Sequence, residues 1–189
     1  MFMNANSLAF KTGSFDHSIS GFVGWYDCFD FNTNQFTQAD LKSKEILRVL
    51  KDGGRFACCS WEEQQDLRFM EQAILRYYPA ILEDHEYLER RPIGLAYEKP
   101  EGYEIILRSA GFRNIQIIRE EAIFISTNEE EWWQQMLQVG WASLTGKIEL
   151  NGHDQLQRIK EAIFKDLQYY KQADGIQFSK TVFFVCGIK

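Results

Sequence analysis

The chain has 189 residues, of which 45% are hydrophobic and 15% aromatic, so it can bury the core of a single globular domain and is not a disordered chain. Its 27 acidic residues outnumber its 21 basic ones, which gives a formal net charge of −6. This balance argues against a general affinity for nucleic acid or anionic membranes, because binding to phosphates needs a basic surface.

The N-terminal part of the chain predicts a strand followed by a helix. Residues 15–25 (FDHSISGFVGW) are rich in β-branched and aromatic residues, which favours a strand. In residues 37–51 the apolar positions recur at helical spacing, so we expect a helix there. Thr37 is its expected N-cap, and Gly53 follows its end.

A second strand and a second helix follow. Residues 54–61 (GRFACCSW) form a continuous apolar run, as in strands that are buried on both faces. Residues 62–78 predict a helix that Pro79 ends. Residues 79–100 have no clean periodicity, and we interpret them as a surface insertion.

The alternation of helices and strands continues to the C-terminus. Residues 103–112 predict a short helix with Gly111 as its C-cap, and residues 114–125 predict a strand. The remaining expected elements are a helix at 127–141 that begins at Thr127 and Asn128, a helix at 154–171 and a strand at 180–188. This alternation favours an α/β fold with parallel strands.

The cysteines form neither a metal-binding nor a disulfide pattern. Cys28, Cys58, Cys59 and Cys186 contain no CxxC pair, so we interpret them as buried free thiols of a cytoplasmic protein without a metal site. The N-terminus lacks a signal-peptide pattern. No apolar run approaches the roughly 18 residues of a transmembrane helix, so we expect no membrane partner.

Three phrases, in this order, resemble class I S-adenosylmethionine (SAM) dependent methyltransferases, in particular methyltransferase type 11 and the ubiquinone/menaquinone methyltransferase-like proteins. They are NANSLAFKTGSFD (residues 4–16), LRVLKDGGRF (47–56) and LRSAGFRNIQI (107–117). In that family the first phrase ends the adenine-binding loop and starts strand four. The second leads from a helix into a strand, and the third precedes strand six. The final strand of the chain resembles the family's antiparallel strand seven.

The resemblance implies a Rossmann-like SAM methyltransferase fold of which this chain matches the C-terminal half, with a mixed sheet and an antiparallel last strand. The family's sheet order is 3-2-1-4-5-7-6, and strands one to three have no counterpart in these residues. We therefore expect residues 1–189 to form a single methyltransferase-like domain that is N-terminally truncated relative to the family. Residues 79–100 and 127–171 are expected to be substrate-cap elements.

The resemblance also implies a SAM site of which part is missing. The family holds SAM through a Gly-rich turn and an acidic residue at the ribose, and this sequence contains no GxGxG. Asn4 and Ala5 lie where the family has an Asp-Ala pair at the adenine, and an Asn amide oxygen can also accept a hydrogen bond. Gly21, Phe22 and Val23 are expected beside the methionine part of the cofactor.

Aromatic residues suggest a site for a small-molecule substrate. Trp25 and Tyr26 follow the first strand, at the end of an α/β sheet where ligands bind, and Trp133 lies on a predicted cap helix. For all three the alternative is an aromatic cluster in the core. The NPPY-type motif of methyltransferases that act on DNA bases or protein amides is absent. No residue stands out as a catalytic base, and we interpret His85, in the charged run EDHEY, as a surface residue.

The resemblance favours SAM-dependent methyl transfer to a small molecule, although the isolated chain is expected to be inactive. Two alternatives remain. The chain is a non-catalytic methyltransferase-like remnant or assembly module, or the missing half of the cofactor site is encoded upstream of residue 1. The absent GxGxG leaves all three interpretations open.

Residues 15–25 also predict an interaction surface. Without the family's first three strands this segment becomes the edge of the sheet. It is apolar and contains no proline or lysine to block pairing with another chain. We therefore expect a homodimer in which this strand pairs with its copy.

Overall fold

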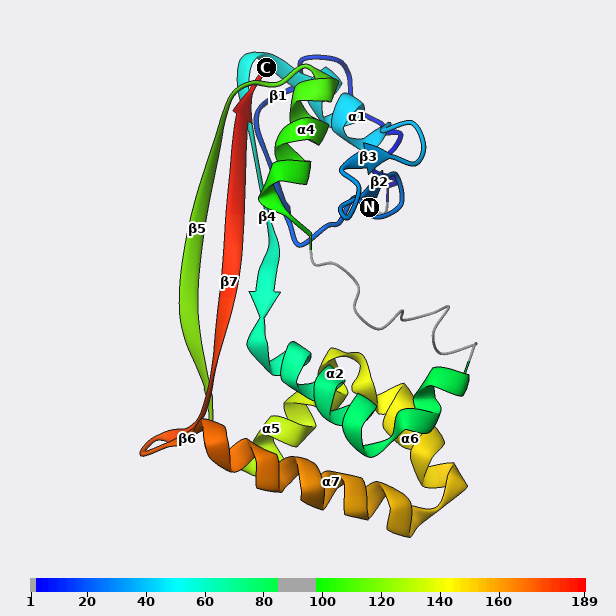
Figure 1. Cartoon of the computed structure of the whole chain (residues 1–189). Coiled ribbons are helices and arrows are strands. Elements are labelled where there is room, and N and C mark those ends of the chain that lie inside the picture. The colour runs from blue at the N-terminus through cyan, green and yellow to red at the C-terminus, as the bar shows by residue number, and fades with distance from the viewer. Residues whose placement is uncertain (1–2, 85–97) are drawn as a thin grey trace. The chain divides into compact units, whose positions relative to one another are not determined.

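The computed structural model describes residues 3–84 and 98–189 (Figure 1). The chain divides into two compact units. The first unit comprises Met1–Glu63, Ala96–Glu121 and Thr181–Lys189, and the second comprises Gln64–Leu95 and Ala122–Lys180. Where they are described, the expected cap segments 79–84 and 127–171 belong to the second unit.

Helices separate the long strands of the described chain, as the sequence predicts (Figure 1). In chain order they are β1 (Phe15–Gly21), β2 (Phe29–Asp30), β3 (Gln35–Phe36), α1 (Lys42–Val49), β4 (Leu50–Gln64), α2 (Gln65–Tyr77), η1 (Pro79–Glu83), α4 (Pro100–Ala110), β5 (Arg113–Ser126), α5 (Glu129–Met136), η2 (Leu137–Trp141), α6 (Ala142–Asn151), α7 (His153–Leu167), η3 (Gln168–Tyr170), β6 (Lys171–Gln172) and β7 (Gly175–Ile188).

The main sheet has the strand order β1-β4-β7-β5, and β6 pairs with β7. β1 and β4 run parallel, with Ser18 opposite Phe56. The chain end after β7 returns to the start of β4, where Lys189 donates to the Gly54 carbonyl and accepts from Gly53 N–H. β7 is therefore antiparallel to β4. This confirms the predicted α/β fold with a mixed sheet and an antiparallel last strand.

The core of the first unit lies between the sheet and two helices. Alternate side chains of β4 and β7, such as Phe56 and Phe183, pack with Ile46 of α1 and Ile106 of α4. These four side chains are buried, which leaves the opposite face of the strands outside this core. α4 ends at Gly111, whose φ of 112° is left-handed, so the predicted glycine C-cap is confirmed.

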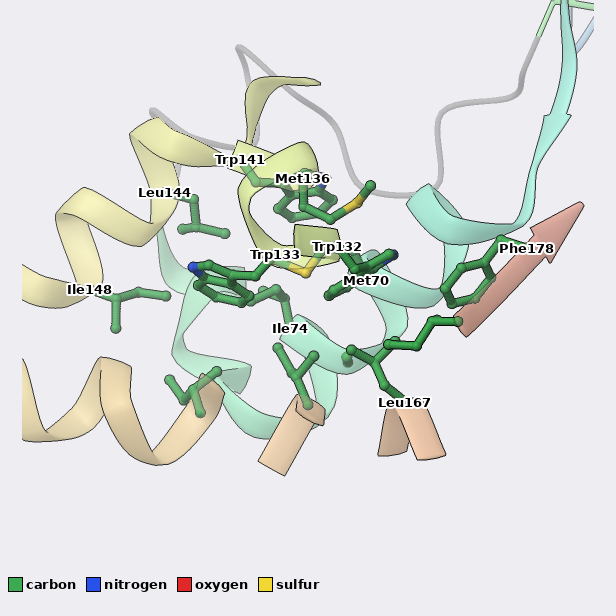
Figure 2. Packing of buried hydrophobic residues seen from close by; sticks show 14 of the residues in the cluster. Met70, Ile74, Trp132, Trp133, Met136, Trp141, Leu144, Ile148, Leu167 and Phe178 are labelled. Carbon is green, nitrogen blue, oxygen red and sulfur yellow. The ribbon is translucent and has the colours of Figure 1, made fainter. Parts of the chain in front are cut away.

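The core of the second unit is built from helices and from the start of β7, and it is rich in tryptophan (Figure 2). α5 begins after Asn128, whose side chain accepts a hydrogen bond from Glu131 N–H at 2.9 Å. The helix then carries its aromatic face inward. The buried residues labelled in Figure 2 are Met70, Ile74, Trp132, Trp133, Met136, Trp141, Leu144, Ile148, Leu167 and Phe178.

Several predicted boundaries were wrong for local reasons. β1 ends at Gly21 and not at residue 25, because Phe22 has a left-handed φ of 54° that a strand cannot continue. α1 begins at Lys42 and not at Thr37, and it is the Asp40 side chain that accepts from Ser43 N–H, at 3.0 Å.

The second unit also differs from the prediction between residues 127 and 151. The predicted helix at 127–141 ends as α5 at Met136 and passes through η2, where Gly140 has a φ of 111°. α6 then follows without having been predicted. Within the described ranges, no helix combines the length and the apolar character that crossing a membrane requires.

Candidate functional site

The N-terminal loop of the first unit is fastened to α1 by an ion pair. Arg48 and Glu45 form two hydrogen bonds of 2.8 Å with each other. Arg48 also donates to the carbonyls of Leu8 and Phe10, and Glu45 accepts from Leu8 N–H at 2.9 Å. The hydrogen bonds from Arg48 and from Leu8 lower the pKa of Glu45 to about 2. The charged pair thus fixes the loop that resembles the adenine-binding loop.

Asn4 and Ala5 lie in a tight turn at the start of this loop. Asn4 Oδ1 accepts from Asn6 N–H at 2.9 Å, and the Asn4 carbonyl accepts from Ser7 N–H at 3.0 Å. Asn4 is exposed and Ala5 half-buried. An amide oxygen has two lone pairs, so Asn4 can accept a further hydrogen bond from a ligand.

At the carboxyl end of β1 the chain turns sharply and exposes apolar side chains. Phe22 N–H donates to the Cys59 carbonyl at 2.9 Å, and the left-handed φ of Phe22 turns its ring onto Trp61, with ring centroids 5.0 Å apart. Phe22 is 52% exposed and Val23 46%. A Cβ at Gly21 would contact only Cys59 Sγ, at 3.9 Å, so a ligand can approach this backbone closely. The structure thus brings Gly21, Phe22 and Val23 together at one end of the parallel strands.

The peptide bond between Gly24 and Trp25 is held from both sides by buried charged side chains. Lys42 Nζ donates to the Gly24 carbonyl at 2.6 Å, and Trp25 N–H of the same peptide donates to Glu98 Oε1 at 3.0 Å. Lys42 also pairs with Asp27 at 3.0 Å. A Cβ at Gly24 would lie 2.6 Å from Glu98 Oε1, so the close approach requires glycine.

The Glu98 carboxylate gathers three donors in the core. Besides Trp25 N–H it accepts from Ser60 Oγ and, at 2.5 Å, from the Tyr103 hydroxyl. Glu98 is 4% exposed and Tyr103 is fully buried. Burial, followed by the charge of Glu98, raises the pKa of Tyr103 above its usual range. Sequence reasoning missed this network, because Glu98 lies 73 positions from Trp25 in an irregular segment that carries no local signal.

The three expected substrate-binding residues differ in exposure. Tyr26 is 52% exposed, whereas Trp25 is fully buried and donates from Nε1 to Ser43 Oγ at 3.0 Å. Trp133 is 4% exposed and lies in the core of the second unit (Figure 2). The burial of Trp25 and Trp133 agrees with the alternative interpretation, that these side chains belong to the core. His85 lies outside the described residues.

Comparison with known proteins gives a likeness in structure. No protein-family model and no curated protein matches the chain. A Bacillus halodurans protein described as a methyltransferase is 15% identical, with 99% of this chain and 69% of that one covered and a TM-score of 0.48. The YcgJ protein of Bacillus subtilis is 16% identical, with 99% of this chain and 69% of that protein's chain covered and a TM-score of 0.46. Phosphoethanolamine N-methyltransferase 2 of Haemonchus contortus is 16% identical, with 98% of this chain and 36% of that protein's chain covered and a TM-score of 0.40.

Proposed function

We propose that this chain contributes part of the site of a SAM-dependent methyltransferase that acts on a small molecule. The observation that carries the proposal is the strand order β1-β4-β7-β5 with an antiparallel β7. It agrees with the 4-5-7-6 end of the sheet order that the three sequence phrases imply. In such sheets ligands bind at the carboxyl ends of the parallel strands. Here β1 leads into Phe22, whose ring stacks on Trp61 of β4.

Two parts of the chain fit two parts of SAM. Asn4 keeps a free lone pair for the adenine amino group, beside the half-buried Ala5. Gly21, Phe22 and Val23 offer an open backbone and an apolar surface for the methionine part and its sulfonium. SAM supplies the activated methyl group, and the residues of this chain bind and orient it for in-line transfer. Tyr26, exposed beside this turn, would face the substrate.

The proposal also predicts weak binding by this chain. The family binds the cofactor through a Gly-rich turn, an acidic residue at the ribose and the adenine loop. The sequence offers neither the Gly-rich turn nor an identifiable ribose carboxylate. Losing contacts worth a few kcal/mol in total lowers affinity by orders of magnitude, because about 1.4 kcal/mol is a factor of ten. The same observation favours the second candidate function, a non-catalytic methyltransferase-like module.

Calorimetric titration of the purified chain with S-adenosylhomocysteine tests the proposal. We expect a dissociation constant in the millimolar range. Gly21→Val is expected to abolish binding while leaving the fold intact, because a Cβ there meets only Cys59 Sγ at 3.9 Å. His17→Val, at the other end of β1, is the matched control and should bind like the parent. No detectable binding at millimolar ligand would favour the non-catalytic module. A micromolar dissociation constant would contradict the predicted loss of the contacts from the Gly-rich turn and the ribose carboxylate.

The proposed assembly has two further parts. Residues 79–100 and 127–171 are proposed to cover the substrate. The proposed partner is a second copy of the chain, bound through residues 15–25, of which the structured strand is β1.

A further inference from the structure

A cavity of about 250 Å³ lies in the second unit, where α2 packs against the end of α7 and the short helix η3 (Figure 1). α2 lines it with Phe69, Gln72, Ala73 and Arg76. These positions are three or four residues apart, so they share one face of the helix. Ala73 is 3% exposed, and its single methyl group between the larger Phe69 and Arg76 leaves the space open. The cavity is therefore a slot that follows α2.

One end of the slot is aromatic. The ring centroids of Phe69 and Tyr170 lie 5.1 Å apart, and those of Tyr170 and Phe178 lie 4.5 Å apart. Phe69 also packs edge-on against Trp132, with ring centroids 5.5 Å apart. Because these neighbours already hold both rings in place, little side-chain freedom is lost when a ligand binds. Phe69 and Tyr170 thus offer a preformed surface on which an aromatic ring can pack.

The other end of the slot is polar and rich in hydrogen-bond donors. Arg76 donates from Nη1 to Asp166 Oδ2 at 2.9 Å, and the Tyr77 hydroxyl donates to the same oxygen at 2.8 Å. A guanidinium has five N–H groups in a planar fork, so donors of Arg76 remain for a ligand. The Gln72 amide and the Tyr169 hydroxyl, which belong to exposed residues, line the same cavity.

We infer that this slot binds a small aromatic carboxylate, with its ring against Phe69 and Tyr170 and its carboxylate at Arg76. The N–H fork of an arginine matches the two oxygens of a carboxylate. Phe69 and Arg76 are seven residues apart, so about 10 Å of helix separates them, which suits one ring with a short acidic arm. This inference concerns the second unit alone and does not depend on methyl transfer.

The charges at the polar end favour an anionic ligand over a cationic one. The side chain of Arg76 is 63% exposed, whereas that of Asp166 is 19% exposed. Asp166 already accepts from Arg76 and from the Tyr77 hydroxyl. An approaching ligand therefore meets the guanidinium before the carboxylate. An ammonium group at this end would be repelled by the nearer Arg76, and a carboxylate would be attracted to it.

Amide chemical shifts of the full chain during titration with phenylacetate test the inference. We expect saturable shifts at Gln72, Ala73, Tyr169 and Tyr170, with a dissociation constant in the millimolar range. Phenethylammonium has the same ring and a cationic arm, and it should bind at least about tenfold more weakly. This comparison uses the parent chain, so it does not rely on the folding of a variant. Equal or tighter binding of phenethylammonium would overturn the inference.

Arg76→Gln tests the polar end. It removes charge-assisted hydrogen bonds and should weaken phenylacetate binding about tenfold, while the Tyr77 hydroxyl still holds Asp166. Arg68→Gln changes an exposed arginine of α2 outside the cavity lining, so this matched control should bind like the parent. Unchanged binding by Arg76→Gln would overturn the inference. Shifts that do not saturate, or that appear in the first unit alone, would overturn it too. All titrations are made without SAM, so their outcome is independent of the titration with S-adenosylhomocysteine.

Discussion

Replacing Glu98 by alanine should destabilise the first unit more than any single hydrogen bond could explain. The Glu98 carboxylate accepts from Trp25 N–H, the Ser60 hydroxyl and the Tyr103 hydroxyl, and all three donors belong to buried residues. A buried donor left without an acceptor costs about 1–3 kcal/mol. In the variant the two hydroxyls can turn toward each other, but Trp25 N–H cannot move.

Glu98→Ala loses the packing of the Glu98 side chain and leaves Trp25 N–H without an acceptor. From the two costs together, we expect the free energy of unfolding to fall by about 3–5 kcal/mol. Tyr103→Phe is the matched control. It removes one donor and leaves Glu98 bound to the other two, so we expect a loss of about 1–2 kcal/mol. Urea titration followed by tryptophan fluorescence measures both values. The reasoning would be refuted if Glu98→Ala cost less than Tyr103→Phe, or if it lay within about 1 kcal/mol of the parent.

Two further predictions concern α1 and α4. The pKa of Glu45 is lowered from 4.5 to about 2, so its pairing with Arg48 stabilises the fold above pH 4.5 and is lost as the pH falls toward 2. The difference in urea midpoint between the parent and Glu45→Gln should therefore shrink as the pH falls from 4.5 toward 2. A difference that stays constant would contradict the stabilising role of the pair. In α4, Gly102→Ala would place a Cβ 2.6 Å from the Phe31 ring, and we expect a loss of about 1–3 kcal/mol in unfolding free energy despite the better helix propensity. Gly146→Ala in α6 meets nothing within 4 Å and should gain up to about 1 kcal/mol, so equal effects at the two sites would exclude the steric explanation.

The parts of the fold that were predictable have strong local signals. The glycine cap at Gly111 and the Asn128 N-cap each follow from residues within one turn of the helix they bound. α6 lacks such a signal. Gly146 interrupts it and its apolar residues are sparse, so its position depends on tertiary packing of Leu144 and Ile148 in the core of the second unit.

The candidate site was predictable only in part, for the same physical reason. Gly21, Phe22 and Val23 could be placed at the end of a strand, because a strand and its following turn are local features. The left-handed φ of Phe22 could not be foreseen, because it occurs together with contacts to Cys59 and Trp61, which lie on β4 and far along the chain. The Glu98 network joins residues that lie far apart in the sequence.

The central claim is that SAM binds at the carboxyl end of β1, beside Trp61 of β4, and amide chemical shifts measured during titration with S-adenosylhomocysteine test it most directly. We expect the largest shifts at Gly21, Phe22 and Val23, with a second group at Asn4 and Ala5. The Gly21→Val variant should lose both groups together. Shifts confined to the second unit, or no shifts at millimolar ligand, would contradict the claim.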